Sequence, residues 1–455
     1  MSASRVVLVA SALALAGCDG CQKRESSAVP APSGSVSSSA VPAPPPTVVA
    51  ESLPRCRVDG PRLAIPGEEV VSGDGVMAPD AIFVGVVRRD GGRRLASVVR
   101  ASLDLSSMKT LDLGASLGED PPPSPRAHGG SVFVASYVRA RAGADAGSAT
   151  GAMTRVLEVS RFEGEAFVRQ GAIVQQADES LAFDIGWTGP FDSAAAQGAP
   201  LVAWDEDAPL VTGQLIADRG VVKVQLVNGP KARVASPDTT DAEAPRLLPK
   251  KGGYWLAWLA RKPEATEDAG AAPEGPGERR AYRWVELVSL DAKGEPTSPV
   301  RRITPEKGRV ASFDLVQAAA EAGAEPRLVL LVQDEAAHSE GAGERIVRYV
   351  VDGPRVESGD LLDGGVGHAL VDVLTSADET HAPRWLAFSD PQEHTHVVPL
   401  GPSVTLGAGP TAEPALDGVR VVAAGPSAEV IYAVGAAGGA DAAGGRVELR
   451  RLVCR

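Results

Sequence analysis

The chain has 455 residues, with 58 acidic and 45 basic side chains, so its formal net charge is −13 at pH 7. This length allows a substantial core, and the acidic balance argues against a nucleic-acid partner, because phosphate backbones require basic patches. Aromatic residues make up only 4% of the chain, whereas Gly and Pro number 50 and 36, so Val, Ala and Leu have to build the core between frequent turns.

The first residues have the organisation of an export signal. Arg5 precedes an apolar run at 6–16, which is too short to span a bilayer as a helix. The run ends in Leu15-Ala16-Gly17-Cys18, which resembles the lipobox of bacterial lipoproteins. The resemblance implies that residues 1–17 are a signal peptide and that Cys18 becomes a lipidated first residue. Several acyl chains anchor a protein stably, because each buried methylene contributes roughly 0.8 kcal/mol.

The anchor sets expectations for location and for the next segment. We expect a cell-envelope protein attached to a membrane through lipid, with the outer membrane favoured over the inner. Residues 18–54 form an anchor and tether rich in Ser, Pro and Ala, which cannot bury enough surface to offset its ordering entropy. A folded domain is therefore expected over 55–455. An ordinary signal peptide cut at another position is the alternative.

Two kinds of segment alternate after residue 56. The first is a short apolar run, and the second is a strand-like segment that ends at a turn. The apolar runs, which we expect to be the inner strands of repeated units, are 81–87, 131–138, 200–207, 254–260, 327–334, 384–390 and 429–436. Their partners are 94–104, 154–164, 221–229, 282–294, 345–353, 394–401 and 446–454. The body therefore contains seven pairs.

The spacing of these pairs indicates the fold. Equivalent positions in the apolar runs lie 50, 68, 54, 74, 56 and 46 residues apart, and the long intervals contain the insertions 142–153 and 262–279. A repeat of roughly 40–50 residues with several strands is typical of a β-propeller. Runs that are apolar on both faces fit blades covered on both sides. We predict an all-β chain with a single seven-bladed propeller; six or eight blades and stacked β-sandwiches are the alternatives.

The whole pattern resembles the propeller-bearing lipoproteins of high-GC Gram-negative bacteria. The resemblance covers roughly residues 60–455 and is one of pattern, because no blade signature motif is present. It implies a lipid-anchored body that presents loops to a partner.

Three cysteines remain if Cys18 carries lipid, namely Cys21, Cys56 and Cys454. An exported protein meets an oxidising compartment, so a disulfide is expected. Cys56 lies where the body begins and Cys454 near the end of the last partner strand. Because the two ends of a propeller commonly share one blade, we predict a Cys56–Cys454 bond that closes the ring. A free thiol at Cys454 is the alternative.

Motifs for catalysis and metal binding are weak. Ser116 lies in a G-x-S-x-G match, but the Pro-rich segment that follows is incompatible with the helix of a nucleophile elbow. His394 and His396 point the same way in a strand, yet no third metal ligand is evident. Carboxylates at 205–207 and 334–335 are interpreted as a solvated rim rather than a calcium site. We expect no catalytic residue among these motifs, no metal and no cofactor.

Trp187, in a loop-like segment, is the best candidate for an exposed ligand contact. The first functional hypothesis is a non-enzymatic envelope protein that binds a protein or glycan partner, with its oligomeric state left open. The alternative is an envelope hydrolase that acts on a polysaccharide through acidic residues at the propeller axis. Glycosidases need two carboxyl groups at a set separation, which a sequence cannot place.

Overall fold

The structure is a computed structural model in which the chain has two units, residues 1–51 and residues 52–455. It describes residues 56–117, 120–141, 153–174, 182–187, 199–207, 219–262, 282–306, 308–318, 326–334, 344–362, 369–375, 383–390, 394–401, 403–406, 419–425, 429–436 and 446–454. The predicted signal peptide 1–17, Cys18 and the tether 18–54 lie outside these residues. Within them, all regular elements are β-strands, and no helix long and apolar enough to cross a membrane occurs.

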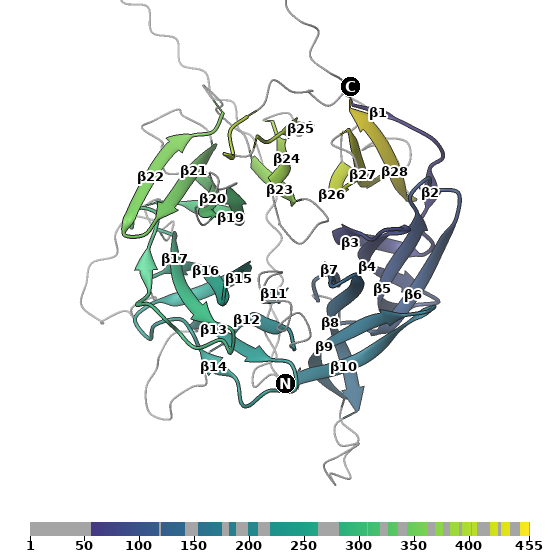
Figure 1. Cartoon of the computed structure of the whole chain (residues 1–455). Coiled ribbons are helices and arrows are strands. Elements are labelled where there is room, and N and C mark those ends of the chain that lie inside the picture. The colour runs from purple at the N-terminus through teal and green to yellow at the C-terminus, as the bar shows by residue number, and fades with distance from the viewer. Residues whose placement is uncertain are drawn as a thin grey trace, which may run out of the picture. The chain divides into compact units, whose positions relative to one another are not determined.

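The body, residues 52–455, is a seven-bladed β-propeller, as the repeat count predicted (Figure 1). Each blade is an antiparallel sheet whose strands follow the chain outward. The first three blades contain β3 (Glu68–Met77), β4 (Ala81–Asp90), β5 (Arg93–Ser102) and β6 (Met108–Ala115); β7 (Ser124–His128), β8 (Ser131–Arg141), β9 (Met153–Glu163) and β10 (Ala166–Val174); and β11 (Phe183–Gly186), β12 (Leu201–Asp207), β13 (Gly220–Leu226) and β14 (Arg233–Val234).

The next blades repeat this order. The fourth and fifth contain β15 (Asp241–Lys250), β16 (Gly253–Arg261), β17 (Trp284–Asp291) and β18 (Arg301–Arg302); and β19 (Val310–Ala318), β20 (Arg327–Asp334), β21 (Arg345–Asp352) and β22 (Arg355–Asp360). The sixth contains β23 (Ala369–Thr375), β24 (Pro383–Ser389) and β25 (Thr395–Pro399). The seventh contains β26 (Val419–Ala424), β27 (Val430–Ala436), β28 (Val447–Cys454) and β1 (Cys56–Val58), with β2 (Leu63–Ala64) also on β28.

The seventh blade joins the two ends of the body. Strand β1 pairs with β28 in a register that places Cys56 opposite Cys454, and the two cysteines form the predicted disulfide. An ion pair between Asp59 and Arg451 lies beside it. The bond encloses a loop of 398 residues, for which the chain-entropy model gives an upper limit of about 6 kcal/mol. Ring closure is therefore covalent as well as hydrogen-bonded.

The apolar runs identified in the sequence form the second strand of each blade. Their central residues are fully buried, for example Ala203, Ala257 and Ala387 at 0% exposure, because neighbouring blades cover both faces of the sheet. The expectation that these runs line the axis is wrong. A shorter or more irregular strand precedes each run and takes the innermost position.

Neighbouring blades approach each other very closely at one glycine. A Cβ atom on Gly85, in the middle of β4, would lie 1.7 Å from the carbonyl oxygen of Pro123. The segment leading into β7 thus packs directly on the backbone of the first blade. Only glycine permits this contact, which fixes where the next innermost strand begins.

Candidate functional site

A cavity of about 280 Å³ lies on the propeller axis. It is lined by the innermost strands of all seven blades, namely β3, β7, β11, β15, β19, β23 and β26. In Figure 1 these strands surround the centre of the ring. The cavity is therefore built from seven segments that are distant in sequence.

Each innermost strand contributes one charged residue to the cavity lining. In blade order these are Asp74, Arg126, Asp184, Arg246, Asp314, Asp372 and Arg420, hereafter the axial ring. Going round the ring, acidic and basic side chains alternate from blade to blade. The alternation fails once, between Asp314 and Asp372, because perfect alternation is impossible with an odd number of blades.

Irregularities in the innermost strands accompany these charges. Asp74 lies within a register shift between Ser72 and Gly75, and Asp372 ends another in β23. Arg246 follows a shift that contains Ala244, whose φ of 53° is left-handed. Bulges re-aim side chains. The ring charges can therefore face the axis although their strands break the regular alternation of side chains.

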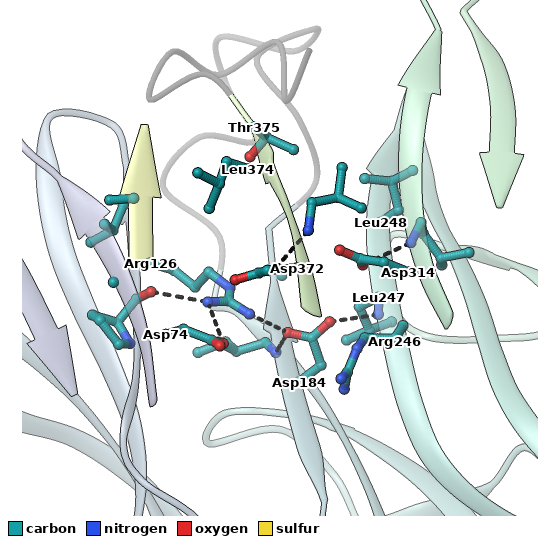
Figure 2. A pocket seen from close by; sticks show the side chains of 18 of the residues that line it. Asp74, Arg126, Asp184, Arg246, Leu247, Leu248, Asp314, Asp372, Leu374 and Thr375 are labelled. Carbon is teal, nitrogen blue, oxygen red and sulfur yellow. Dashed lines mark hydrogen bonds and ion pairs between the residues drawn. The ribbon is translucent and has the colours of Figure 1, made fainter. Parts of the chain in front are cut away.

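The first part of the ring is held by direct ion pairs. Arg126 donates from Nη1 to Asp74 Oδ2 at 3.1 Å and from Nη2 to Asp184 Oδ1 at 3.2 Å (Figure 2). Arg420 Nη2 donates to Asp74 Oδ1 at 3.0 Å. The Ser124 hydroxyl donates to Asp74 as well, at 3.0 Å. We call Arg420, Asp74, Arg126 and Asp184 the paired arc.

Electrostatics keep Asp74 and Arg126, two members of the paired arc, charged. Burial alone would raise the pKa of Asp74, but Arg126, Arg420 and Arg246 hold it well below its usual range. Burial disfavours the charged form of Arg126, but Asp74 and Asp184 raise its pKa above the ordinary value. Asp74 and Arg126 therefore exchange no protons near neutral pH, and their role is positional.

Asp314 and Asp372, the acidic pair, lie on the adjacent strands β19 and β23 and behave differently. Each accepts a hydrogen bond from the following backbone N–H, Leu315 at 2.7 Å and Val373 at 2.8 Å. Burial raises the pKa of Asp314 to about 7, and the Asp372 charge adds to the rise while Arg246 opposes it. Burial and the Asp74 charge raise the pKa of Asp372 to about 6, against Arg420 and Arg126.

The order of these two titrations follows from the two raised pKa values, of which that of Asp372 is the lower. Asp372 ionises first, and its charge then disfavours ionisation of Asp314. Between about pH 6 and pH 7 one carboxyl group is charged and the other carries a proton. A cavity with one acid and one carboxylate at neutral pH can donate and accept protons on a bound molecule.

Trp187 also reaches the cavity, at the end of β11. Its indole stacks on the His128 ring, with centroids 5.0 Å apart and an interplanar angle of 11°, and packs on Phe133. With 6% exposure it is not the exposed side chain that the sequence suggested. Both Trp187 and His128 line the cavity, so a contact with a ligand stays a prediction.

The other motifs have structural surroundings. Ser116 follows β6 without a helix, and its Oγ lies 3.2 Å from Asp120 Oδ2, so the nucleophile elbow is absent. Asp205 accepts the backbone N–H groups of Ala182 and Ala244, at 2.9 and 2.8 Å. The interpretation of the carboxylates at 205–207 and 334–335 as a solvated rim is wrong for Asp205, Glu206 and Asp334, which are 7%, 2% and 6% exposed. Asp205 holds the bulge before Arg246, and Glu206 pairs with Lys223 and accepts the Trp204 indole N–H.

The histidine pair converges on one carboxylate. His394 Nδ1 and His396 Nε2 lie 3.2 and 2.8 Å from Asp390 Oδ2, and the His396 ring stacks on Phe388. In the part of the chain that the structure describes, no three His, Cys, Asp or Glu side chains are grouped as a metal site.

Sequence reasoning missed the axial ring. Its successive members are 48 to 68 residues apart (372 to 420 and 246 to 314 at the extremes), and several share their strand with other charges, such as Glu68 and Glu69 in β3 or Asp241 and Glu243 in β15. The pattern of one ring charge per blade has no marker in the sequence. It became visible only once the innermost strands were located.

The sequence matches no known family model and no curated protein. Solved structures of similar arrangement include an α-L-arabinofuranosidase of Fusarium graminearum with arabinobiose, at 10% identity and TM-score 0.41, covering 88% of this chain and 97% of that one. Another is an ulvan lyase, at 8% identity and TM-score 0.49, covering 86% and 95%. A third is an acylaminoacyl peptidase of Pyrococcus horikoshii, at 10% identity and TM-score 0.45, covering 84% and 51%. Similarity at this level says nothing about chemistry, which the side chains have to supply.

Proposed function

We propose that this protein is a cell-envelope hydrolase that cleaves a polysaccharide in its axial cavity, with Asp314 and Asp372 as the reacting pair. The observation that carries the proposal is the placement of two carboxyl groups on adjacent blades of one cavity, at the point where the charge alternation fails. Glycoside hydrolysis requires such a pair, one group protonated and the other ionised.

The roles follow from the order of ionisation. Asp314, with its pKa of about 7, donates its proton to the glycosidic oxygen as the bond to the sugar carbon breaks. Asp372, with its pKa of about 6, is ionised and acts on the opposite side of that carbon, as a base for water or as a nucleophile. Water supplies the hydroxyl group of the product in both routes. If Asp372 is the base, it takes the proton of that water, and exchange with solvent then returns the proton to Asp314; if Asp372 is the nucleophile, Asp314 itself takes the proton of the water that cleaves the covalent intermediate. The anomer of the first product distinguishes these two routes.

The paired arc supports this chemistry without taking part in it. Its ion pairs fix the innermost strands of the first, second, third and seventh blades around the cavity. Fixed charges that are already in place stabilise developing charge at little reorganisation cost. The paired arc therefore keeps the cavity preorganised beside the acidic pair.

The test is to incubate the full-length protein with a panel of neutral and acidic bacterial polysaccharides. Hydrolysis is measured as the release of reducing ends. We expect Asp314→Asn and Asp372→Asn each to lower kcat by about 10²–10⁴-fold. The matched control is Asp352→Asn, an exposed carboxylate of β21 in the same blade as Asp314, which is expected to keep full activity. The competing hypothesis of a non-enzymatic scaffold predicts no turnover and no difference among the three variants.

Attachment through lipid at Cys18 is part of the proposal, because it rests on the lipobox resemblance. Mass spectrometry of the mature amino terminus is expected to find acyl groups on Cys18, and Cys18→Ala is expected to release the protein from membranes. An unmodified terminus at another residue would refute the anchor while leaving the hydrolase proposal standing.

A further inference from the structure

The three arginines of the axial ring differ in what their guanidinium groups bind. Arg126 is bound by two carboxylates and donates to the Pro125 carbonyl at 3.1 Å. Arg420 binds Asp74 and the Ser72 carbonyl, the latter at 3.2 Å. Arg246 donates to the carbonyl oxygen of Pro245 at 3.2 Å and forms no ion pair with any described carboxylate.

The acidic neighbours of Arg246 are engaged elsewhere. Asp184 Oδ1 accepts from Arg126 and from the Ile185 N–H, and its Oδ2 accepts the Leu247 N–H at 2.8 Å. On the other side, Asp314 is the group that holds a proton up to about pH 7. A neutral carboxyl group is a poor partner for a guanidinium. The guanidinium of Arg246, which lies on the wall of the cavity (Figure 2), thus has N–H donors available for a ligand.

The charge of Arg246 acts into the cavity. It lowers the pKa of Asp314 in the next blade and that of Asp74, which lies across the ring. The left-handed Ala244 two residues earlier, fixed by Asp205, gives the strand its bulge just before Arg246. Such a conformation is strained for a residue other than glycine, which points to a positional requirement at Arg246.

The net charge of the ring sets which ligand fits. Four Asp and three Arg side chains sum to −1, and one proton on the acidic pair brings the sum to zero. A ring of zero net charge does not repel an anion, and Arg246 is the ring guanidinium without an ion pair to a described carboxylate, so an anion can bind at Arg246. A planar guanidinium binds carboxylate or sulfate oxygens with two parallel hydrogen bonds.

We propose that Arg246 binds the anionic substituent of an acidic sugar, a carboxylate or a sulfate ester, so that the substrate class is acidic polysaccharide. The inference rests on the proposed use of the cavity for a sugar, but it concerns binding and can be measured without turnover. The cavity, at about 280 Å³, is near the lower limit of roughly 300 Å³ for small-molecule sites, which suits one sugar unit and its substituent.

Binding is measured by calorimetry or ligand-observed NMR on full-length protein with matched methyl glycosides. The probes differ only at carbon 6: glucuronate, glucose and glucose 6-sulfate, with galacturonate, galactose and galactose 6-sulfate as a second set. We expect at least one anionic sugar to bind and its neutral counterpart to bind about 10–100-fold more weakly, the value of one charged hydrogen-bonding group. Preference between carboxylate and sulfate identifies the substituent.

Variants assign the effect to Arg246. Arg246→Gln is expected to remove the preference for the anionic sugar, and Arg246→Lys to restore it in part, because a lysine supplies charge without the planar fork. Arg93→Gln, at the exposed first residue of β5 in the first blade, is the control and is expected to bind like the wild type. Equal binding of neutral and anionic sugars, no binding of either set, or an unaffected Arg246→Gln variant would each overturn the inference.

The two proposals fail separately. If Asp314→Asn binds the anionic sugar but no polysaccharide is hydrolysed by the wild type, Arg246 keeps its role and the hydrolase proposal is refuted. If neutral polysaccharides are hydrolysed and Arg246→Gln retains that activity, the hydrolase proposal stands and Arg246 is not a specificity residue.

Discussion

The paired arc and the acidic pair occupy equivalent positions in successive blades, yet their carboxyl groups have different partners. Asp74 forms ion pairs with two arginines and stays ionised, whereas burial and the Asp372 charge outweigh the Arg246 charge at Asp314, which holds its proton to about pH 7. Seven is odd, so a ring of alternating charges must contain one like-charged step. The repeat therefore generates a structural region and a proton-exchanging region from the same position.

Removing Arg126, the central arginine of the paired arc, should destabilise the protein more than removing an arginine without ion pairs. Arg126→Met leaves the Asp74 and Asp184 carboxylates beside each other without their shared partner. Breaking a fully buried pair typically costs about 3–5 kcal/mol. Because the Arg126 and Asp74 side chains keep 31% and 35% exposure, we expect a loss at the lower end, about 3 kcal/mol, in urea unfolding at pH 7. Arg246→Met, in the same ring but without an ion pair to any described carboxylate, is the control and should cost less. Equal losses in the two variants would mean that the ion pairs of Arg126 add no stability to the paired arc.

Removing the disulfide should lower the free energy of unfolding without changing the difference between the paired arc and the acidic pair. The Cys56→Ser and Cys454→Ser double variant releases the closure between β1 and β28. We expect a loss of about 2–5 kcal/mol, with the pH dependence of unfolding unchanged because neither cysteine contacts the axial ring. A changed pH dependence would show that the ring charges depend on closure.

Neutralising one member of the acidic pair should stabilise the protein at alkaline pH. The folded-state pKa of Asp314 is raised from 3.8 to about 7, so its stability contribution is full below about pH 4 and is lost as the pH rises to 7. Asp314→Asn removes that loss. We expect a gain of about 1–3 kcal/mol at pH 8, after discounting for water in the cavity, and no gain at pH 4. Destabilisation at pH 8 would contradict the raised pKa.

The smallest expected effect is on the pH profile of hydrolysis. Activity should fall below about pH 6, where Asp372 gains a proton, and above about pH 7, where Asp314 loses one. The change across these limbs should be about tenfold per pH unit, and Asp352→Asn should leave them in place. An optimum above pH 8 would exclude the assigned roles.

The sequence determined the scaffold, because burial on both faces forces runs such as 200–207 and 254–260 to be apolar along their whole length. Seven such runs, each with a partner, specified seven blades, and the position of Cys454 in the last partner specified how the ring closes. The apolar runs are local patterns, and Cys56 and Cys454 mark the two ends of one domain. Counting the runs and measuring their spacing is therefore enough to predict the blades and the closure.

Only the tertiary structure decided the candidate site. Asp314 and Asp372 are 58 residues apart (372 minus 314), and neither stands out among 58 acidic residues. Their special chemistry depends on which strand is innermost, on bulges that turn the side chains to the axis and on the closure of an odd-numbered ring. Each of these is a property of the assembled blades, because a charge acquires its partner, or lacks one, only when distant strands meet.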